Sequence, residues 1–255
     1  MDVYTKLTDL TSRYKGIVVA LGMFDGVHIG HQSIIRRAVS LAREQGGTAM
    51  VFTFSNHPLA VLAPQALPPQ IGNNLLRQTR LAELGVDVLM SIPFTRSFAG
   101  NSPEEFLQLL RQHMAPRCVV TGPNYTFGAK GKGNQRLLLR EGASYGFATE
   151  ICPAVLRDGR PVSSTRIRAL LDQGNLGEAN DFLGYAFTVM DRVIHGDQRG
   201  GHWASLRPIL RSLMSGLCCL MVSMQHGSYI KANLTMDWQI LVTIRRLPAA
   251  TVVSK

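Results

Sequence analysis

The sequence has few charged residues and no long apolar run. Only 17 % of its 255 residues are charged and 45 % are hydrophobic, which excludes a disordered chain and favours a packed core. No apolar stretch approaches the roughly 20 residues that span a bilayer. The first residues, 1–4, form neither a basic leader nor an apolar signal segment. We expect a cytoplasmic protein of one large or two small domains, with no membrane partner.

Cysteine is scarce, and its arrangement excludes the usual zinc and disulfide patterns. The four cysteines are Cys118, Cys152, Cys218 and Cys219. They form no Cys-x-x-Cys pair and have no histidine at ligand spacing. We therefore expect reduced thiols and no metal ion held by protein ligands.

Acidic residues are also few, but the resulting positive charge is not arranged for nucleic acid. The formal net charge is +10, and half of it falls in residues 201–255, which hold six Lys or Arg and one Asp. The other basic residues are scattered, without the interleaved aromatics of a nucleic-acid-binding stripe. The sequence thus favours anionic small molecules over nucleic acid as partners, and it leaves the oligomeric state open.

Alternating strand-like and helix-like segments fill the first 184 residues. Residues 17–21 are continuously apolar, as in a strand buried on both faces, and residues 32–44 place apolar side chains along one helical face. Further strands are expected at 48–54, 86–92, 119–121 and 147–151, and further helices at 75–84, 103–113, 165–172 and 176–183. This alternation predicts an α/β fold, a Rossmann-like domain with a parallel sheet and crossover helices.

The pattern changes after Gly184. Residues 185–195 are typical of a strand and residues 196–200 of a turn, but neither the helical nor the strand period continues beyond that point. We therefore divide the chain at Gly184 and treat residues 201–255 as a separate tail.

The segment Gly22–His31 lies between the first predicted strand and the first predicted helix. Open α/β sheets bind nucleotides at this position, and glycines before a helix N-terminus favour close approach of phosphate. His28 and His31, with Gly30 between them, are spaced so that both imidazoles can donate to one anionic centre. A pair of surface histidines on an ordinary loop is the structural alternative.

Three further features follow predicted strands or open predicted helices. Ser163–Arg168 combines hydroxyls and free N–H groups with an arginine one turn inside the helix, which suits phosphate, although an ordinary helix cap also explains the serines. Gly122–Asn134 places aromatic and amide side chains before a Gly/Lys loop. This arrangement suits a flat heterocycle, or it is only a flexible surface loop. His57 belongs to the same site or is a structural histidine.

Together these motifs, in this order, resemble the bacterial bifunctional riboflavin kinase/FMN adenylyltransferases, the prokaryotic FAD synthetases. The resemblance covers about residues 14–200. Gly22–His31 matches the family's GxFDGVHxGH turn, Gly122–Gly128 its GxN(F/Y)xFG element and Ser163–Arg168 its SSTxIR element. The two histidines and the SST element are shared with other nucleotidyltransferases, whereas the Phe-Asp-Gly-Val and Asn elements point to flavin.

The resemblance implies transfer of AMP from Mg²⁺-bound ATP to FMN, giving FAD and pyrophosphate by in-line attack without a covalent intermediate. The matching positions imply catalytic roles for His28, His31 and Arg168. They imply ATP binding by Gly22, Phe24, Asp25, Gly30, Ser163, Ser164 and Thr165, and flavin binding by His57, Asn124, Tyr125 and Phe127. A related nucleotidyltransferase with another acceptor and a non-catalytic nucleotide-binding remnant are the alternatives.

The resemblance also implies that residues 185–200 begin a β-barrel riboflavin kinase module. His195–Gly200 fits the family's GDxRGRxxGFPTAN stretch, but Gly201–Leu210 does not. A shifted reading frame can restore the missing motif there and a later kinase motif at Asp237–Leu247. We therefore hypothesise an out-of-frame tail from about Gly201, an uncompleted barrel and no riboflavin kinase activity.

Overall fold

The chain falls into two compact units in the computed structural model. The described residues are 1–10, 13–192, 228–235 and 239–246. The first unit comprises Met1–Pro68 and Arg77–Val162, and the second comprises Pro69–Leu76 and Ser163–Lys255.

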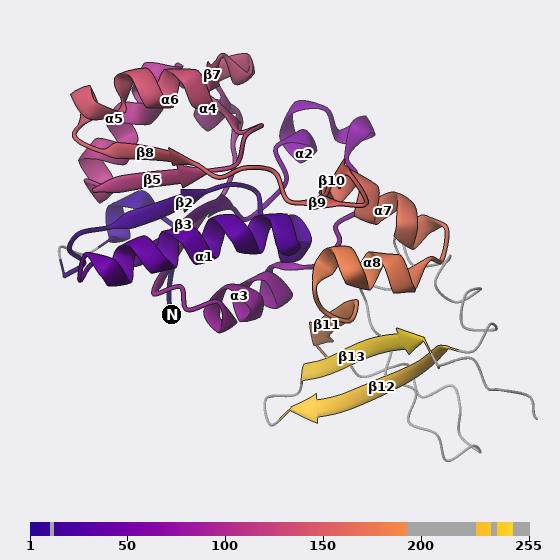
Figure 1. The fold of residues 1–255 in the computed structure, drawn as a ribbon. Helices are drawn as coiled ribbons and strands as arrows, with labels where there is room; N and C mark the ends of the chain where they lie inside the picture. Colours follow the sequence, from indigo (N-terminus) through magenta and orange to yellow (C-terminus); the bar gives the residue numbers. More distant parts are fainter. Residues whose placement is uncertain (11–12, 193–227, 236–238, 247–255) are drawn as a thin grey trace, which may run out of the picture. The chain divides into compact units, whose positions relative to one another are not determined.

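A six-stranded sheet forms the centre of the first unit (Figure 1). Its strands, in order, are β1 (Asp2–Tyr4), β4 (Val88–Ile92), β3 (Ala49–Phe54), β2 (Val18–Leu21), β5 (Cys118–Thr121) and β8 (Ala148–Ile151). Every neighbouring pair is parallel. All residues of β2 and β4 are buried, as expected for strands covered on both faces.

Helices cover both faces of this sheet. One core joins alternate residues of β2 to α1 (Ile29–Glu44) and α3 (Asn74–Glu83): Val18, Ala20, Ile35, Ala38 and Leu81. The other core joins the remaining residues of β2 to α5 (Pro103–Met114) and α6 (Gln135–Glu141): Val19, Leu21, Phe106, Leu110 and Leu138. The alternation of side chains along a strand sends successive residues to opposite cores.

The order of the strands reverses around β2. The chain adds β3 and β4 on one side of β2 and then crosses to place β5 on the other. Loops that leave the carboxyl ends of β2 and β5 therefore lead in opposite directions. Open α/β sheets bind their ligands at such reversal points.

Shorter elements complete the first unit, and several of them were not predicted. They are α2 (Leu59–Leu62), α4 (Arg96–Ala99), the pair β6 (Thr126–Phe127) and β7 (Gly133–Asn134), the hairpin β9 (Leu156–Arg157) and β10 (Arg160–Pro161), and 3-10 turns at Leu7–Asp9, Asp25–Val27, Pro64–Ala66, Ala129–Gly131 and Gly142–Tyr145. The edge strand β1 was also missed. The predicted strands and helices of this unit are present within a few residues, which confirms the α/β class.

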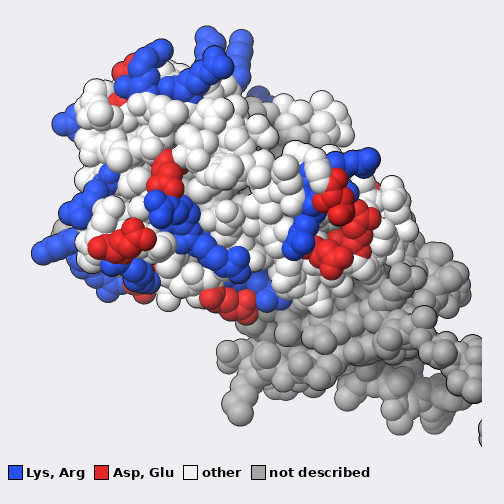
Figure 2. Space-filling view, viewed as in Figure 1, with Lys and Arg blue, Asp and Glu red and all other residues white. Residues whose placement is uncertain are grey.

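Basic and acidic side chains are interspersed on the face of the molecule in Figure 2, where Lys and Arg form several separate groups. Ion pairs link some of these charges, such as Arg37 with Glu150 (3.0 Å) and Arg43 with Asp87 (2.7 Å). Within the described ranges, no helix is both long and apolar enough to cross a membrane.

Two of the four cysteines belong to the described part of the chain. Cys118 and Cys152 are buried free thiols, and burial raises the pKa of Cys118 to about 11. A thiol with such a pKa is protonated at neutral pH and therefore unreactive. Cys218 and Cys219 lie outside the described residues.

In the second unit, α7 (Ser164–Asp172) and α8 (Leu176–Leu183) pack against each other. Arg166 of α7 places its guanidinium 4.3 Å from the centre of the Phe182 ring and donates to the Glu178 carboxylate at 2.9 Å. These contacts join the two helices across their connecting turn. Both predicted helices are confirmed.

Three antiparallel strands follow in the second unit, in the order β11 (Thr188–Arg192), β13 (Gln239–Arg246) and β12 (Ser228–Thr235). β11 confirms, in shorter form, the strand expected at 185–195. β12 and β13 were not predicted, because the sequence of the tail shows no lasting alternation. The turn expected at 196–200 and the junction at Gly201 lie outside the described residues.

Candidate active site

The loop between β2 and α1 turns on left-handed backbone conformations. Phe24 and Val27 have φ angles of 52° and 36°, which are strained for residues other than glycine and cost about 1–3 kcal/mol each. Packing enforces this shape, because the Phe24 ring is fully buried (0 % exposed). Gly22 accommodates the ring, since a Cβ atom at this position would lie 2.8 Å from it. The loop is thus anchored in the core.

His28 and His31 stack on each other at the start of α1. Their ring centroids are 3.6 Å apart with an interplanar angle of 17°. The Nδ1 atom of His28 accepts a hydrogen bond from the backbone N–H of His31 at 3.2 Å, so a neutral His28 ring carries its proton on Nε2. Gly30 leaves room for this ring, because a Cβ there would lie 3.1 Å from it. We call Gly22–His31 the anion loop.

His31 has a buried ring nitrogen, Nδ1, with no hydrogen-bond partner among the described residues. Burial, followed by the charges of His28 and Arg77, holds the pKa of His31 well below its usual range. The ring is therefore neutral at pH 7. Buried polar atoms without partners are rare in proteins, and this one fits a position where a ligand binds.

A buried arginine lies behind the anion loop. Arg77 of α3 is 8 % exposed, and its guanidinium donates to the carbonyl oxygens of Met23 (3.0 Å) and Phe54 (2.8 Å). The hydroxyl of Thr53 donates to the same Met23 oxygen at 3.1 Å. Sequence reasoning missed Arg77, because an arginine in an amphipathic helix usually lies on the solvated face.

Two residues predicted to bind ATP are buried within the anion loop. Phe24 is fully covered, and Asp25 is 8 % exposed and faces the charge of Arg77. The Phe24 side chain therefore shapes the loop from the protein side. His28 (4 % exposed) and Gly26 are buried as well. The parts of the loop that keep exposed surface are Gly22, Met23 and the start of α1 at residues 29–31, where free N–H groups of the helix lie.

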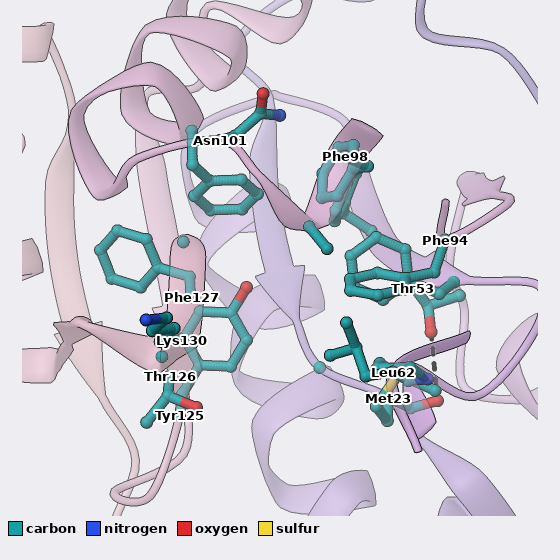
Figure 3. Close-up of a pocket in the computed structure, with 18 of the residues that line it drawn as sticks. Met23, Thr53, Leu62, Phe94, Phe98, Asn101, Tyr125, Thr126, Phe127 and Lys130 are labelled. Carbon is teal, nitrogen blue, oxygen red and sulfur yellow. Dashed lines mark hydrogen bonds between the residues drawn. The ribbon is translucent and has the colours of Figure 1, made fainter. Parts of the chain in front are cut away.

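An aromatic pocket of about 420 Å³ adjoins the anion loop at Gly22 and Met23. Phe94 and Phe98 lie along one side of it, and Tyr125, Phe127 and Lys130 along the other (Figure 3). The Tyr125 and Phe127 rings are nearly parallel, with an interplanar angle of 20°. Burial raises the pKa of Tyr125, so its phenol is neutral. Facing aromatic walls of this kind suit a planar heterocycle.

Three of the four residues predicted to bind flavin line this pocket: Asn124, Tyr125 and Phe127. His57 is not among the lining residues. Its Nδ1 accepts the N–H of Leu59 at 3.1 Å, and the neighbouring Pro58 lines the pocket instead. The phenylalanines after β4 were missed, although an aromatic cluster at the carboxyl end of a strand was a usable signal.

Comparison with known proteins shows the family of the chain. The profile of the FAD synthetase family matches residues 10–166, more than half of the chain. The chain belongs to the FAD synthetase family. Bifunctional riboflavin kinase/FMN adenylyltransferases from Listeria monocytogenes, Bacillus subtilis and Escherichia coli K12 are 37 %, 34 % and 33 % identical to it over 184, 184 and 187 residues. These alignments cover 72 %, 72 % and 73 % of this chain but 58 %, 58 % and 60 % of the relatives.

A solved structure shares the fold of this FAD synthetase family member. It is described as a macrolide-efflux protein from Streptococcus pneumoniae and aligns with a TM-score of 0.65 and 31 % sequence identity. The alignment covers 76 % of this chain and 74 % of the other. The efflux activity in its name is stated of that protein alone.

The SSTxIR element of this FAD synthetase family member belongs to the second unit. Ser163 caps α7, because its hydroxyl accepts the N–H of Arg166 at 3.3 Å. Arg168 donates from Nε to the carbonyl of Pro69 at 2.7 Å within the same unit. The capping role of Ser163 is therefore established by geometry, and phosphate binding by Ser163–Arg168 stays a prediction.

Proposed function

We propose that this chain transfers the AMP group of MgATP to FMN, producing FAD and pyrophosphate. The proposal rests on one observation: Gly22 and Met23 belong to the anion loop and also line the aromatic pocket. A planar ring in the pocket can therefore extend a phosphate-bearing tail toward His28 and His31. Membership of the FAD synthetase family supports FMN as the acceptor.

The proposed reaction needs positioning and charge stabilisation rather than a protein nucleophile. A phosphate oxygen of FMN attacks the α-phosphorus of ATP, the bond to the β-phosphate oxygen breaks, and pyrophosphate leaves with the electron pair. The attacking phosphate is already anionic, so no side chain has to remove a proton. Ring N–H groups of His28 and His31 stabilise the charge that develops on the α-phosphate oxygens.

The aromatic pocket fits a flavin in size and chemistry. Its volume of about 420 Å³ falls within the roughly 300–1,000 Å³ of small-molecule sites. Stacking between ring faces would hold the isoalloxazine. Asn124 and Lys130 supply an amide and a positive charge at the same pocket, which suit polar ring atoms and the phosphate of FMN.

Magnesium enters the proposed reaction as part of the substrate MgATP. Proteins usually hold this ion through nucleotide phosphates and one or two carboxylates. In the part of the chain that the structure describes, no group of three or more His, Cys, Asp or Glu side chains is placed to hold a metal. The proposed contribution of the anion loop is a set of N–H donors for the phosphates.

We further propose three segments: residues 1–184 as the adenylyltransferase, 185–200 as the start of a riboflavin kinase module and 201–255 as an out-of-frame tail. Alignments of 184–187 residues with the three bacterial relatives support the first of these. Riboflavin kinase activity is then absent. Sequencing the coding DNA around codons 199–202, with the intact mass of the protein, tests the frame, and an in-frame read with matching mass contradicts it.

Product analysis tests the activity itself. The purified chain is incubated with MgATP and either FMN or riboflavin, and flavins are separated by chromatography. We expect FAD from FMN and no product from riboflavin. We also propose that the protein is cytoplasmic, acts on small molecules and has no nucleic-acid partner. FMN formed from riboflavin contradicts loss of the kinase. ATP binding without FAD formation contradicts the proposed acceptor, and a panel of other nucleotide and phosphopantetheine acceptors then follows.

A further inference from the structure

Arg77 joins two structures that the proposed reaction uses together. Its Nη1 donates to the Met23 carbonyl in the anion loop at 3.0 Å, and its Nη2 donates to the Phe54 carbonyl at the end of β3 at 2.8 Å. Both Met23 and Phe54 line the aromatic pocket, whereas Arg77 does not. The guanidinium therefore lies behind the pocket wall.

We propose that Arg77 is a positioning residue that fixes the anion loop relative to the aromatic pocket and places a permanent positive charge behind the loop, without touching either substrate. This inference rests on the proposed function, because the two substrates must be aligned for in-line attack. A shift of about 1 Å between reacting groups is enough to slow such a step by about 100-fold.

The Met23 carbonyl is held from two directions. Thr53 of β3 donates its hydroxyl hydrogen to this oxygen at 3.1 Å, as the dashed line in Figure 3 marks. Met23 directly precedes Phe24, the first strained residue of the loop. Two donors on one oxygen fix the orientation of the peptide that leads into the strained conformation. The donor with a full charge makes the stronger of the two hydrogen bonds.

A guanidinium group suits this position better than an ammonium group. Its planar fork presents separate N–H groups to two acceptors in fixed directions. A lysine at position 77 keeps the charge but cannot hold Met23 and Phe54 with the same geometry. The Arg77→Lys substitution therefore separates the contribution of the charge from that of the paired hydrogen bonds to Met23 and Phe54.

The charge of Arg77 also acts on the anion loop. Asp25 is the acidic group that faces it, and His31 feels both the Arg77 charge and the neighbouring His28 ring. Because the positive charge of Arg77 disfavours the imidazolium form, it helps to lower the pKa of His31. Removing this charge should raise that pKa, which a purely structural role of Arg77 would leave unchanged.

Four variants separate these contributions. Arg77→Met removes the charge and both hydrogen bonds, Arg77→Lys retains the charge, and Thr53→Val removes only the second donor to Met23. Arg43→Met is the matched control. It removes an arginine of α1 that pairs with Asp87 at 2.7 Å. Asp87 directly precedes β4, so this ion pair lies at the amino ends of the strands, whereas the site lies at their carboxyl ends.

The first measurement is the titration of His31 by NMR in protein labelled with ¹⁵N-histidine, without substrates. We expect the His31 pKa to rise in Arg77→Met and to remain as in the unmodified chain in Arg77→Lys, Thr53→Val and Arg43→Met. An unchanged His31 titration in folded Arg77→Met overturns the proposal. This measurement needs no activity, so a chain that makes no FAD contradicts the proposed function and leaves the test of Arg77 in place.

The second measurement is the rate of FAD formation. We expect kcat to fall by about 100-fold in Arg77→Met and about 10-fold in Arg77→Lys, as misalignment of reacting groups predicts. KM for FMN and ATP should change less, because the groups that touch the substrates remain. Arg43→Met should match the unmodified chain. If Arg77→Met does not fold, unchanged kcat in both Arg77→Lys and Thr53→Val overturns the proposal.

Discussion

The anion loop and the aromatic pocket acquire their shapes in different ways. The loop depends on single features: two non-glycine residues with left-handed backbone, one buried arginine and two glycines, each of which faces a ring. The pocket depends on many ring contacts of similar strength. Phe98, for example, has ring centroids of three neighbours at 5.2–6.3 Å: Phe54, Phe94 and Phe106. A shape built from unique contacts is sensitive to each of them, whereas a redundant network tolerates the loss of one.

The largest effect is expected at the histidine pair. In the proposed reaction His28→Ala removes a donor to the α-phosphate, and the loss of one such donor lowers kcat by about 100- to 1,000-fold. Initial rates of FAD formation at saturating MgATP and FMN measure this. His113→Ala, near the end of α5, is the control and should retain full activity. A loss below tenfold in His28→Ala would mean that the loop is as redundant as the pocket.

A second substitution tests the support of the loop. In Gly22→Ala the new methyl group would lie 2.8 Å from the buried Phe24 ring, so either the ring or the backbone must shift. Overpacking of this kind costs about 1–3 kcal/mol of unfolding free energy, which urea denaturation measures.

Gly177→Ala is the matched control for that experiment. It lies in α8, where the nearest atom to a new Cβ is 4.0 Å away, and alanine should stabilise the helix by about 0.5–1 kcal/mol. We therefore expect Gly22→Ala to lower the free energy of unfolding and Gly177→Ala to raise it. Equal effects would contradict the view that Gly22 is fixed by packing.

The pocket should respond more weakly. Phe98→Leu removes one ring from the network, and a ring pair contributes about 0.5–1.5 kcal/mol, so KM for FMN should rise by about 2- to 10-fold with little change in kcat. Phe147→Leu, a buried ring of the same core outside the pocket, should leave KM unchanged. A fall in kcat without a change in KM would mean that Phe98 supports the anion loop rather than binding FMN in the pocket.

A smaller change is expected in the pH dependence of stability. The pKa of His31 in the folded chain lies well below 6.5, so the unfolded chain takes up a proton first as the pH falls. The contribution of this residue is complete above about pH 6.5 and is lost progressively below it. In urea denaturation between pH 7 and pH 5, the unfolding free energy of His31→Asn should therefore decline less steeply than that of the unmodified chain. Equal slopes would contradict the burial of His31.

Much of the first unit was predictable, because strands buried on both faces require apolar runs. Residues 17–21 contain β2, and the start of α5 was visible in its capping residues. There the Ser102 hydroxyl accepts the Glu105 N–H at 3.1 Å, and the Glu105 carboxylate accepts the Ser102 N–H at 2.6 Å. β1 was not predictable in the same way, since a short edge strand with exposed residues shows neither an apolar run nor a regular alternation of apolar and polar residues.

The candidate site was predictable as a set of motifs but not as a surface. The sequence pattern identified His28 and His31, whose spacing at a helix start is itself the signal. It could not show that the Phe24 ring is buried, because a motif does not distinguish a side chain that packs under a loop from one on its surface, and ATP binding by Phe24 stays a prediction. The wall formed by Phe94 and Phe98 depends on contacts between distant segments, which no local pattern records.

β2 cannot complete its pairing early in synthesis. It pairs with β3 on one side and with β5 on the other, and β5 ends only at Thr121. At a synthesis rate of about 5–20 residues per second, several seconds separate the emergence of β3 from that of β5. During this interval one apolar edge of β2 is open to strands of other nascent chains. While β5 is being synthesised, β2 is thus a part of the growing chain that a chaperone would have to shield.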